Sequence, residues 1–342
     1  MADMRYDRGD ERVPAGESTG PAVPKAVAAI THIQRLAGNA AVGRALRPDP
    51  SQVAQLQGDD NNFGQRVAIS PDLLEMLSET SAPPADRDLV PAVSDATFEQ
   101  YDGHAFVQGH GDRDAVDPND VRQGQLGDCY LCAAMIAVAR AHPERIRSLI
   151  ARQSNGTYNV TLHLKAGVWS REGGAQVVNV VPTFPTTGDA PAYVQQGDQA
   201  ADGPELWAML IEKAYAQVKG GYVSIADGNS GEAAAMLTGG RSTEYRVAST
   251  TPDRIAAIID EALTNRWPVT CNSAGSAKNE SAEKSEDRED YHIVAHHSYA
   301  PRSVDVSAGT VELQNPWGRG DITLLISGPF KRYFSSVDVV RP

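Results

Sequence analysis

Nucleophilic catalysis needs a nucleophile and a base, and this sequence offers Cys129 together with a downstream cluster of His292, His296 and His297 and with Asn315. The apolar run after the cysteine predicts a helix over 127–150, broken near Pro143. Unpaired N–H groups at a helix start favour negative charge, so they lower the pKa of a thiol placed there. A cysteine at a helix start with a distant histidine is typical of a thiolate–imidazolium pair.

The residue pattern by itself leaves three interpretations of Cys129. It could be a buried, inert cysteine, a redox cysteine paired with Cys132 in a Cys-x-x-Cys motif, or a protease nucleophile. Cys271 is the only other cysteine, and an odd count of three indicates no disulfide framework. The cysteine count therefore suits a reducing compartment, where a free thiol survives.

Five sequence blocks between about residues 95 and 340 resemble motifs of the calpain family of papain-like cysteine proteases. Residues 123–130 (QGQLGDCY) are similar to the signature QGxLGDCW, with Tyr130 in place of the tryptophan. The other blocks are similar to EFWxxLLEKAYA, TGG, VANHAY and xLxNPWG, and they lie at 205–216, 238–240, 294–299 and 311–318. Their order favours the protease interpretation over the redox one, and Cys132 becomes a small core-facing residue.

The resemblance implies a role for each residue that matches a motif. Cys129 would attack the peptide carbonyl, His297 would hold the thiolate and protonate the leaving amine, and Asn315 would orient the imidazole. Gln123 and the backbone N–H of Cys129 would stabilise the oxyanion. Trp317 would shield the histidine–asparagine contact, or it is an ordinary core aromatic.

Three histidines, His292, His296 and His297, lie close together within a predicted strand over 292–299. On a strand over 292–299, His292 and His296 share one face and His297 points to the other. The similarity to VANHAY selects His297 as the catalytic histidine and leaves His292 as the alternative. No cysteine or carboxylate pattern accompanies this cluster, so a zinc site is not expected.

Calcium is the cofactor that the resemblance suggests, because animal calpains close their two lobes around calcium. Asp120 and Asp321 occupy the positions of two oxygen ligands in the family motifs. The tryptophan that follows the second acid is Ile322 here, and the further acidic loop has no clear counterpart in 325–333. We therefore expect that no cofactor is required and that calcium is dispensable.

The resemblance and the residue pattern predict an α+β, papain-like fold with two lobes. We expect a flexible leader over 1–95 with a short helical motif at 32–46, a Cys-bearing helical lobe over 96–240 and a His/Asn-bearing β-rich lobe over 241–342. Within these lobes the pattern predicts strands at 157–165 and 177–182, a helix at 203–218 that begins near Pro204, and a mobile acidic loop at 273–290.

The overall composition limits which classes of partner the chain can bind. The chain has 342 residues, 41 % of them hydrophobic, and a net charge of -13. An acidic chain is poorly suited to a nucleic-acid backbone, and we expect neither nucleic-acid nor membrane binding. No apolar stretch approaches the roughly 18 residues of a spanning helix, and the start of the chain lacks a signal-peptide core. We expect a soluble protein made in the cytoplasm.

Residues 34–42 (QRLAGNAAV) resemble a QRxAGNxAV motif found in N-terminal regions of bacterial proteins linked to contractile injection systems. The resemblance implies an effector or toxin cargo that is loaded into a phage-tail-like particle through residues 1–60 and is exported by it. An ordinary amphipathic helix in a propeptide is the alternative interpretation of these residues.

Two other function classes remain open beside a calpain-like endopeptidase acting on protein substrates. One is a catalytically silent module that only binds a partner, and the presence of Gln123, Cys129, His297 and Asn315 argues against it. The other is a thiol acyltransferase of the transglutaminase kind, which generally pairs its histidine with an aspartate rather than an asparagine. Incorporation of a labelled amine distinguishes the acyltransferase from the protease.

Overall fold

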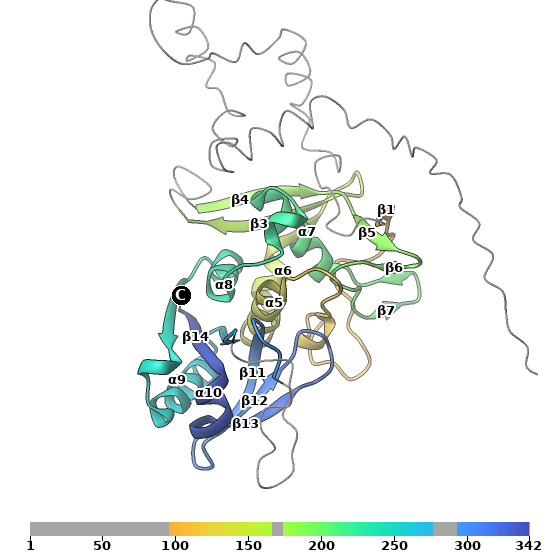
Figure 1. Cartoon of the computed structure of the whole chain (residues 1–342). Helices are drawn as coiled ribbons and strands as arrows, with labels where there is room; N and C mark the ends of the chain where they lie inside the picture. The colour runs from red at the N-terminus through yellow and green to blue at the C-terminus, as the bar shows by residue number, and fades with distance from the viewer. Residues whose placement is uncertain (1–95, 166–173, 276–292, 342) are drawn as a thin grey trace, which may run out of the picture. The chain divides into compact units, whose positions relative to one another are not determined.

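The computed structural model describes residues 96–165, 174–275 and 293–341 (Figure 1). These residues form two hydrophobic cores. One core draws on residues between 116 and 237 with Ala300 and Val340, and the other on residues between 247 and 339. Helices and sheets contribute to both, which confirms the α+β class. The leader with its motif at 32–46, most of the acidic loop and His292 lie outside the described residues.

Helices and small antiparallel sheets surround the first core. The helices are α5 (Cys129–Ala141), α6 (Pro143–Leu149), α7 (Trp207–Lys219) and α8 (Ser230–Thr238), with short turns at Pro118–Asp120 and Tyr222–Ile225. One sheet has the order β2–β3–β4 (Ile150–Arg152, Tyr158–Leu164, Gly174–Val180). Another has the order β1–β5–β6 (Thr97–Gln100, Thr183–Thr187, Ala190–Pro191), and β7 and β8 (Gln199–Ala200, Gly203–Pro204) form a hairpin.

The helix that begins at Cys129 is the centre of the first core. Eleven of the 13 residues of α5 are buried, as expected for a helix that is apolar on every side. It ends where the N–H of His142 donates to the carbonyl of Val138 at 2.6 Å. Pro143 then starts α6, because a proline fits the first position of a helix but not its interior.

The second core lies under an antiparallel sheet in the order β13–β12–β11–β10–β14–β9. The strands are β9 (Arg241–Arg246), β10 (Val269–Ser273), β11 (Ser298–Asp305), β12 (Thr310–Gln314), β13 (Ile322–Leu325) and β14 (Phe334–Arg341). Helix α9 (Pro252–Thr264) packs its buried isoleucines against this sheet, and short helical turns lie at Val247–Ser249, Ile326–Phe330 and α10 (Lys331–Tyr333).

The two cores meet where helices of the first pack on the sheet of the second. Helix α5 contacts β10 and β11, and α8 contacts β9 and β14 (Figure 1). The Arg140 guanidinium donates to the carbonyl of Pro301 at 3.0 Å and to the side chain of Gln314. Cys129 at the start of α5 therefore lies on a helix that packs against strands close in sequence to His297 and Asn315.

Two predictions of local structure are wrong. The helix predicted over 203–218 begins only at Trp207. Gly203 (φ +148°) and Pro204 instead form a strand of a hairpin, and the carbonyl of Pro204 accepts the N–H of His104. Residues 293–297 form a turn rather than a strand, since the backbone of His296 has φ +48° and β11 starts at Ser298.

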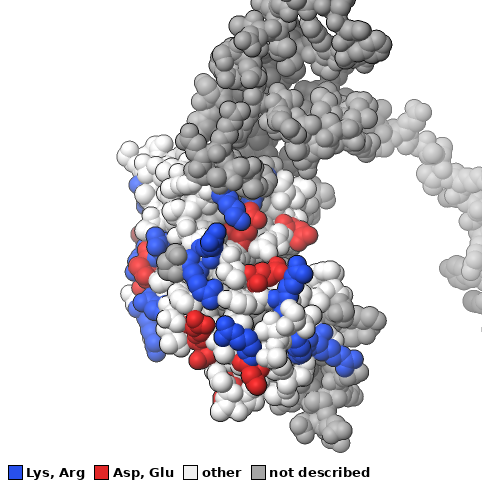
Figure 2. Space-filling view, turned by 90° about the vertical axis from the view of Figure 1, so that its left-hand side faces the viewer, with Lys and Arg blue, Asp and Glu red and all other residues white. Residues whose placement is uncertain are grey.

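Two features of the described residues bear on partners. None of their helices is both long and apolar enough to cross a membrane. On the face shown in Figure 2, Lys and Arg side chains are interspersed with Asp and Glu side chains rather than gathered into one basic patch.

Candidate active site

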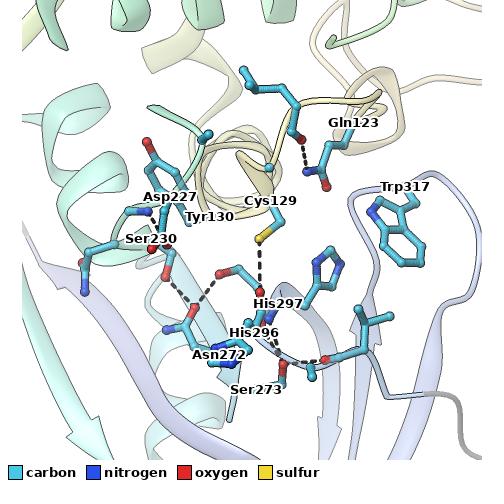
Figure 3. Close-up of a pocket in the computed structure, with 18 of the residues that line it drawn as sticks. Gln123, Cys129, Tyr130, Asp227, Ser230, Asn272, Ser273, His296, His297 and Trp317 are labelled. Carbon is cyan, nitrogen blue, oxygen red and sulfur yellow. Dashed lines mark hydrogen bonds between the residues drawn. The ribbon is translucent and has the colours of Figure 1, made fainter. Parts of the chain in front are cut away.

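A cleft of about 720 Å³ opens at the start of α5, and residues from both cores line it (Figure 3). Cys129 is the first residue of the helix, and its side chain is partly exposed to the cleft. The preceding loop passes close to other backbone: a Cβ on Gly124 would lie 2.1 Å from the carbonyl oxygen of Tyr193. Only a glycine fits there, so the loop places the thiol at the helix N-terminus.

The structure brings His297 and Asn315 together. The Nε2 atom of His297 lies 2.9 Å from Oδ1 of Asn315. The backbone N–H of Trp317 also donates to this Oδ1, at 3.1 Å, which identifies the atom as the amide oxygen. An oxygen can only accept, so Nε2 carries the imidazole proton and Nδ1 is left as the basic nitrogen. Figure 3 shows the His297 ring between the Cys129 sulfur and the Trp317 ring in this view.

The backbone of His297 is held by β10. Its N–H donates to Oγ of Ser273 at 2.9 Å, and its carbonyl accepts the N–H of Ser273 at 2.8 Å. The Cys129 thiol donates a hydrogen bond to the carbonyl of His296, at 3.9 Å. The thiol and the imidazole thus face the same cleft, while the sulfur is still directed at a neighbouring carbonyl.

The backbone of Asn315 is held by Asp321, one of the two candidate calcium ligands. The backbone N–H of Asn315 donates to Oδ1 of Asp321 at 2.9 Å, and Oδ2 forms an ion pair with Arg302 at 3.0 Å. Both carboxylate oxygens therefore have partners, and an adjacent arginine repels a cation. Asp321 does not fit a calcium ligand in this arrangement; it holds the backbone of Asn315.

The Gln123 amide is held inside the protein close to Cys129. Its Nε2 donates to the carbonyl of Leu126 at 2.7 Å, and a hydrogen bond from the amide opposes the rise in the pKa of Asp128 that burial causes. Its backbone N–H donates to the carbonyl of Pro316 at 2.8 Å, which connects this loop to the asparagine strand. To donate to a substrate oxygen, the amide must turn one proton into the cleft, as apo active sites commonly require.

Burial favours uncharged forms of both reacting groups. It raises the pKa of the Cys129 thiol, although a hydrogen bond from the backbone of Ser298 opposes the shift. It lowers the pKa of His297 to about 4, while the hydrogen bond with Asn315 acts in the opposite direction. The structure without substrate therefore favours a neutral thiol and a neutral imidazole whose Nδ1 can take the thiol proton.

Trp317 and Cys132 were both singled out from the sequence. The Trp317 ring is 4.9 Å from the His297 ring between centroids, and the residue is 41 % exposed, so it covers the histidine at the rim of the cleft and is not a core aromatic. Cys132 is fully buried, and its sulfur lies 3.8 Å from Oδ1 of Asp128. The expectation of a core-facing Cys132 is confirmed.

Sequence reasoning missed a buried carboxyl pair next to Cys129. Asp128 and Glu212 are both buried and share a hydrogen bond; burial raises the pKa of Asp128 to about 7 and that of Glu212 well above its usual range. Two adjacent carboxylates repel each other, so the pair retains a proton near neutral pH. Asp128 and Glu212 lie inside the motifs at 123–130 and 205–216. A carboxylate within an otherwise apolar run is the sequence feature that could have revealed them.

The other calcium candidate, Asp120, belongs to an acidic cluster. Ligand atoms of Asp112, Asp120 and Asp198 lie within 4.8 Å of one another. The neighbouring Glu205 is buried, and its Oε2 receives no hydrogen bond among the described residues. Burial raises the pKa of Asp120 to about 6 and, with the charge of Asp120, that of Glu205 to about 9. Crowded carboxylate oxygens with one unpaired acceptor fit a hard cation such as calcium.

A family model described as calpain family cysteine protease matches residues 108–327. The chain is 26 % identical to Calpain-9 of Homo sapiens over 262 residues, which are 75 % of this chain and 36 % of that protein. It is 28 % identical to the Calpain-2 catalytic subunit of Bos taurus over 231 residues, 66 % of this chain and 31 % of that one. The chain therefore spans about a third of the length of these curated relatives.

Proposed function

The chain belongs to the calpain family of cysteine proteases, and from this membership we propose that it is a cysteine endopeptidase that hydrolyses protein substrates. The observation that carries the proposal is the bond between His297 Nε2 and Asn315 Oδ1, which leaves Nδ1 as a base in the cleft that holds Cys129. The arrangement supplies a nucleophile, a base and an orienting group, each from a different segment of the chain.

The proposed reaction has two stages. The Cys129 thiol gives its proton to Nδ1 of His297 while the sulfur attacks the carbonyl carbon of the substrate. The carbon–nitrogen bond then breaks as Nδ1–H protonates the leaving amine, which leaves a thioester on the sulfur. Water attacks the thioester with Nδ1 as base, the carbon–sulfur bond breaks, and the thiol recovers its proton. The burial that keeps both groups neutral beforehand supports this proton transfer.

Gln123 and Trp317 complete the proposed site. The N–H of Cys129 lies at a helix start, where backbone donors lack helical acceptors, and the Gln123 amide is the second donor for the oxyanion. Trp317 covers the outer side of the His297 ring and keeps water from competing for the bond to Asn315.

The test compares wild type, Cys129→Ala and Cys271→Ala on casein with a reductant. Cys271 is buried and does not line the cleft, so it is the matched cysteine control. We expect cleavage by wild type and by Cys271→Ala and none by Cys129→Ala. Cleavage by all three would contradict the assignment of the nucleophile, and cleavage by none would favour the binding module. Incorporation of a labelled amine by wild type alone would favour the acyltransferase.

We propose that calcium is not required for this activity. A mechanism that closes both lobes needs a ligand set in each, and Asp321 is already paired with Arg302. When calcium binds, Asp120 and Glu205 with Asp112 and Asp198 would hold it, and it would neutralise their crowded charges.

The leader carries a proposal of its own. The similarity of 34–42 to the QRxAGNxAV motif supports a bacterial effector that is made in the cytoplasm, is loaded into a contractile injection particle through residues 1–60 and is exported by it. These residues lie outside the described structure, so the proposal rests on the sequence resemblance.

A further inference from the structure

The reaction gives the two ends of the cleft different roles. His297 protonates the leaving amine, so the amine side of the cleaved bond lies beside this ring. Figure 3 shows Asp227, Ser230 and Asn272 on the opposite side of the Cys129 sulfur. These residues line the same cleft and therefore face the acyl side of a bound substrate.

Hydroxyl and amide groups from both cores form one network on this side. Oγ of Ser230 donates to Oδ1 of Asn272 at 2.9 Å or to Oδ2 of Asp338 at 3.1 Å. Oγ of Ser298 donates to the same Oδ1 of Asn272 at 2.7 Å. The Asn272 Nδ2 atom donates to Ser336 at 3.0 Å and to Asp338 at 2.8 Å.

The directions of these bonds decide what the cleft offers to a substrate. Ser298 and Ser230 each give their one proton to an acceptor inside the protein, and Ser335 gives its proton to the carbonyl of Asn272 at 3.0 Å. Both Nδ2 protons of Asn272 are used as well. A hydroxyl that has donated its proton can only accept further bonds. Ser336, which accepts from Asn272, keeps a proton. Oδ1 of Asn272 already accepts from both Ser230 and Ser298, and Oγ of Ser230 accepts from Thr270 at 2.7 Å. The acceptors left for a substrate are therefore mainly Oγ of Ser298, Oγ of Ser335 and the Asp227 carboxylate.

The charged residues that line the cleft also favour a cationic side chain of the substrate. Asp227 lies at the exposed rim, where its carboxylate accepts the N–H of Gly228 at 2.8 Å. Among the described residues, no lysine or arginine lines the cleft. A branched aliphatic side chain would remove water from these acceptors without replacing its hydrogen bonds, which is costly. A cationic side chain would satisfy them.

Ser298 distinguishes this chain from the motif that it otherwise matches. The sequence HHSY at 296–299 aligns with NHAY of the VANHAY pattern, so an alanine position carries a hydroxyl here. That hydroxyl is part of the network through its bond to Asn272.

We propose that the acyl-side wall formed by Asp227, Ser230, Asn272 and Ser298 is a subsite for a lysine or arginine side chain of the substrate. The inference rests on the proposed protease function, since it takes the direction of the bound peptide from His297. It makes the enzyme selective for basic segments of protein substrates.

A peptide library in which each of the first three acyl-side positions is varied tests the subsite with wild-type enzyme. We expect lysine or arginine to exceed leucine by about tenfold in kcat/KM at one of the first two positions, as one hydrogen-bonded charge would give. A preference for leucine or phenylalanine at both positions would overturn the proposal.

Two variants identify the residues that make the preference. Ser298→Ala should lower the ratio of lysine to leucine cleavage several-fold, and Asp227→Asn should lower the ratio of lysine to glutamine cleavage. The matched controls Ser303→Ala, on the exposed part of β11, and Asp189→Asn, in an exposed turn, should leave both ratios unchanged. A general loss of catalysis lowers all rates together and does not move these ratios. Unchanged ratios in Ser298→Ala and Asp227→Asn would contradict the assignment.

Binding to Cys129→Ala separates failure of the subsite from failure of the proposed function, because it needs no catalysis. Fluorescence polarisation should show tighter binding of a labelled peptide with lysine at the preferred position than of its leucine counterpart. Equal affinities, or no saturable binding of either peptide, would overturn the subsite. Tighter lysine binding together with a wild type that cleaves nothing would keep the subsite and reject the protease.

Discussion

Asn315 determines which nitrogen of His297 carries the proton. Its Oδ1 lies 2.9 Å from Nε2 and also accepts the N–H of Trp317, so the proton is on Nε2 and the lone pair is on Nδ1. Asp321 holds the backbone of Asn315, and Ser273 holds the backbone of His297. The tautomer of His297 therefore follows from contacts with Asn315 and does not depend on Cys129.

Asn315→Ala should lower kcat about a hundredfold with little change in KM, because the imidazole loses the acceptor that selects its tautomer and orientation. Steady-state kinetics on a peptide substrate measures the effect. Asn179→Ala, in the remote sheet of β3 and β4, is the matched control and should retain wild-type kcat. An Asn315→Ala variant with full kcat would show that the asparagine does not orient the base.

Gln123→Ala should lower kcat by about 10²–10³-fold, since removal of one oxyanion donor typically costs about 2.7–4 kcal/mol of transition-state stabilisation. Gln125→Ala, an exposed residue of the same loop, is the control and should leave kcat unchanged. If Gln123→Ala instead raised KM alone, the amide would bind the ground state as strongly as the transition state.

Removal of residues 1–60 should abolish loading into an injection particle and spare proteolysis. The proposed loading motif lies in that segment, whereas Cys129, His297 and Asn315 do not. The measurement is immunodetection of the truncated and full-length proteins in purified particles from the producing cells, beside a casein assay. Equal amounts of both proteins in the particles would reject the role of the leader.

The residues of the proposed catalytic site could be selected from the sequence because each lies in a short contiguous motif. The helix start at Cys129 was predictable from one apolar run. The site's geometry was not, because it depends on contacts between residues far apart in the chain. Examples are the bond from Gln123 to Pro316 and the one from Arg140 to Pro301.

Two local features could not be predicted, for physical reasons. His296 and His297 were expected on a strand, but bonds to Ser273 and Ala274 hold this segment in a turn. Asp321 matched a metal-ligand position, and the sequence could not show that Arg302 would form an ion pair with it. Both features depend on contacts between residues far apart in the chain, and periodicity carries no information about such contacts.

Excess chelator should leave proteolysis unchanged, because the catalytic groups need no ion in the proposed mechanism. Calcium at millimolar concentration should still stabilise the fold by about 1 kcal/mol if it binds the acidic cluster with an affinity in the range of extracellular calcium modules. Differential scanning calorimetry with Glu205→Gln should lose this increment, and Asp321→Asn should keep it. Complete loss of activity in chelator, restored by calcium, would make the ion essential.

Acid should destabilise the protein partly through His297. Its folded pKa of about 4 lies below its ordinary value of 6.5, so between these values the unfolded chain binds more protons. Stability should therefore be lost as the pH falls from 6.5 to 4, by about 3 kcal/mol for this group. Urea unfolding should show a shallower acid loss in His297→Ala, whereas the exposed control His110→Ala should follow wild type.

Alkaline pH should act on the fold through Glu205 with the opposite sign. Its pKa is raised from 4.5 to about 9, so the folded chain holds a proton that the unfolded chain releases in this window. Stability from this group is lost as the pH rises through that range, and Glu205→Gln, which stays neutral, should be more stable than wild type at pH 8 in calcium-free buffer. The exposed control Glu99→Gln should not differ from wild type. Equal unfolding midpoints for Glu205→Gln and wild type at pH 8 would show that the clustered carboxyl groups do not lower the stability of the fold at this pH.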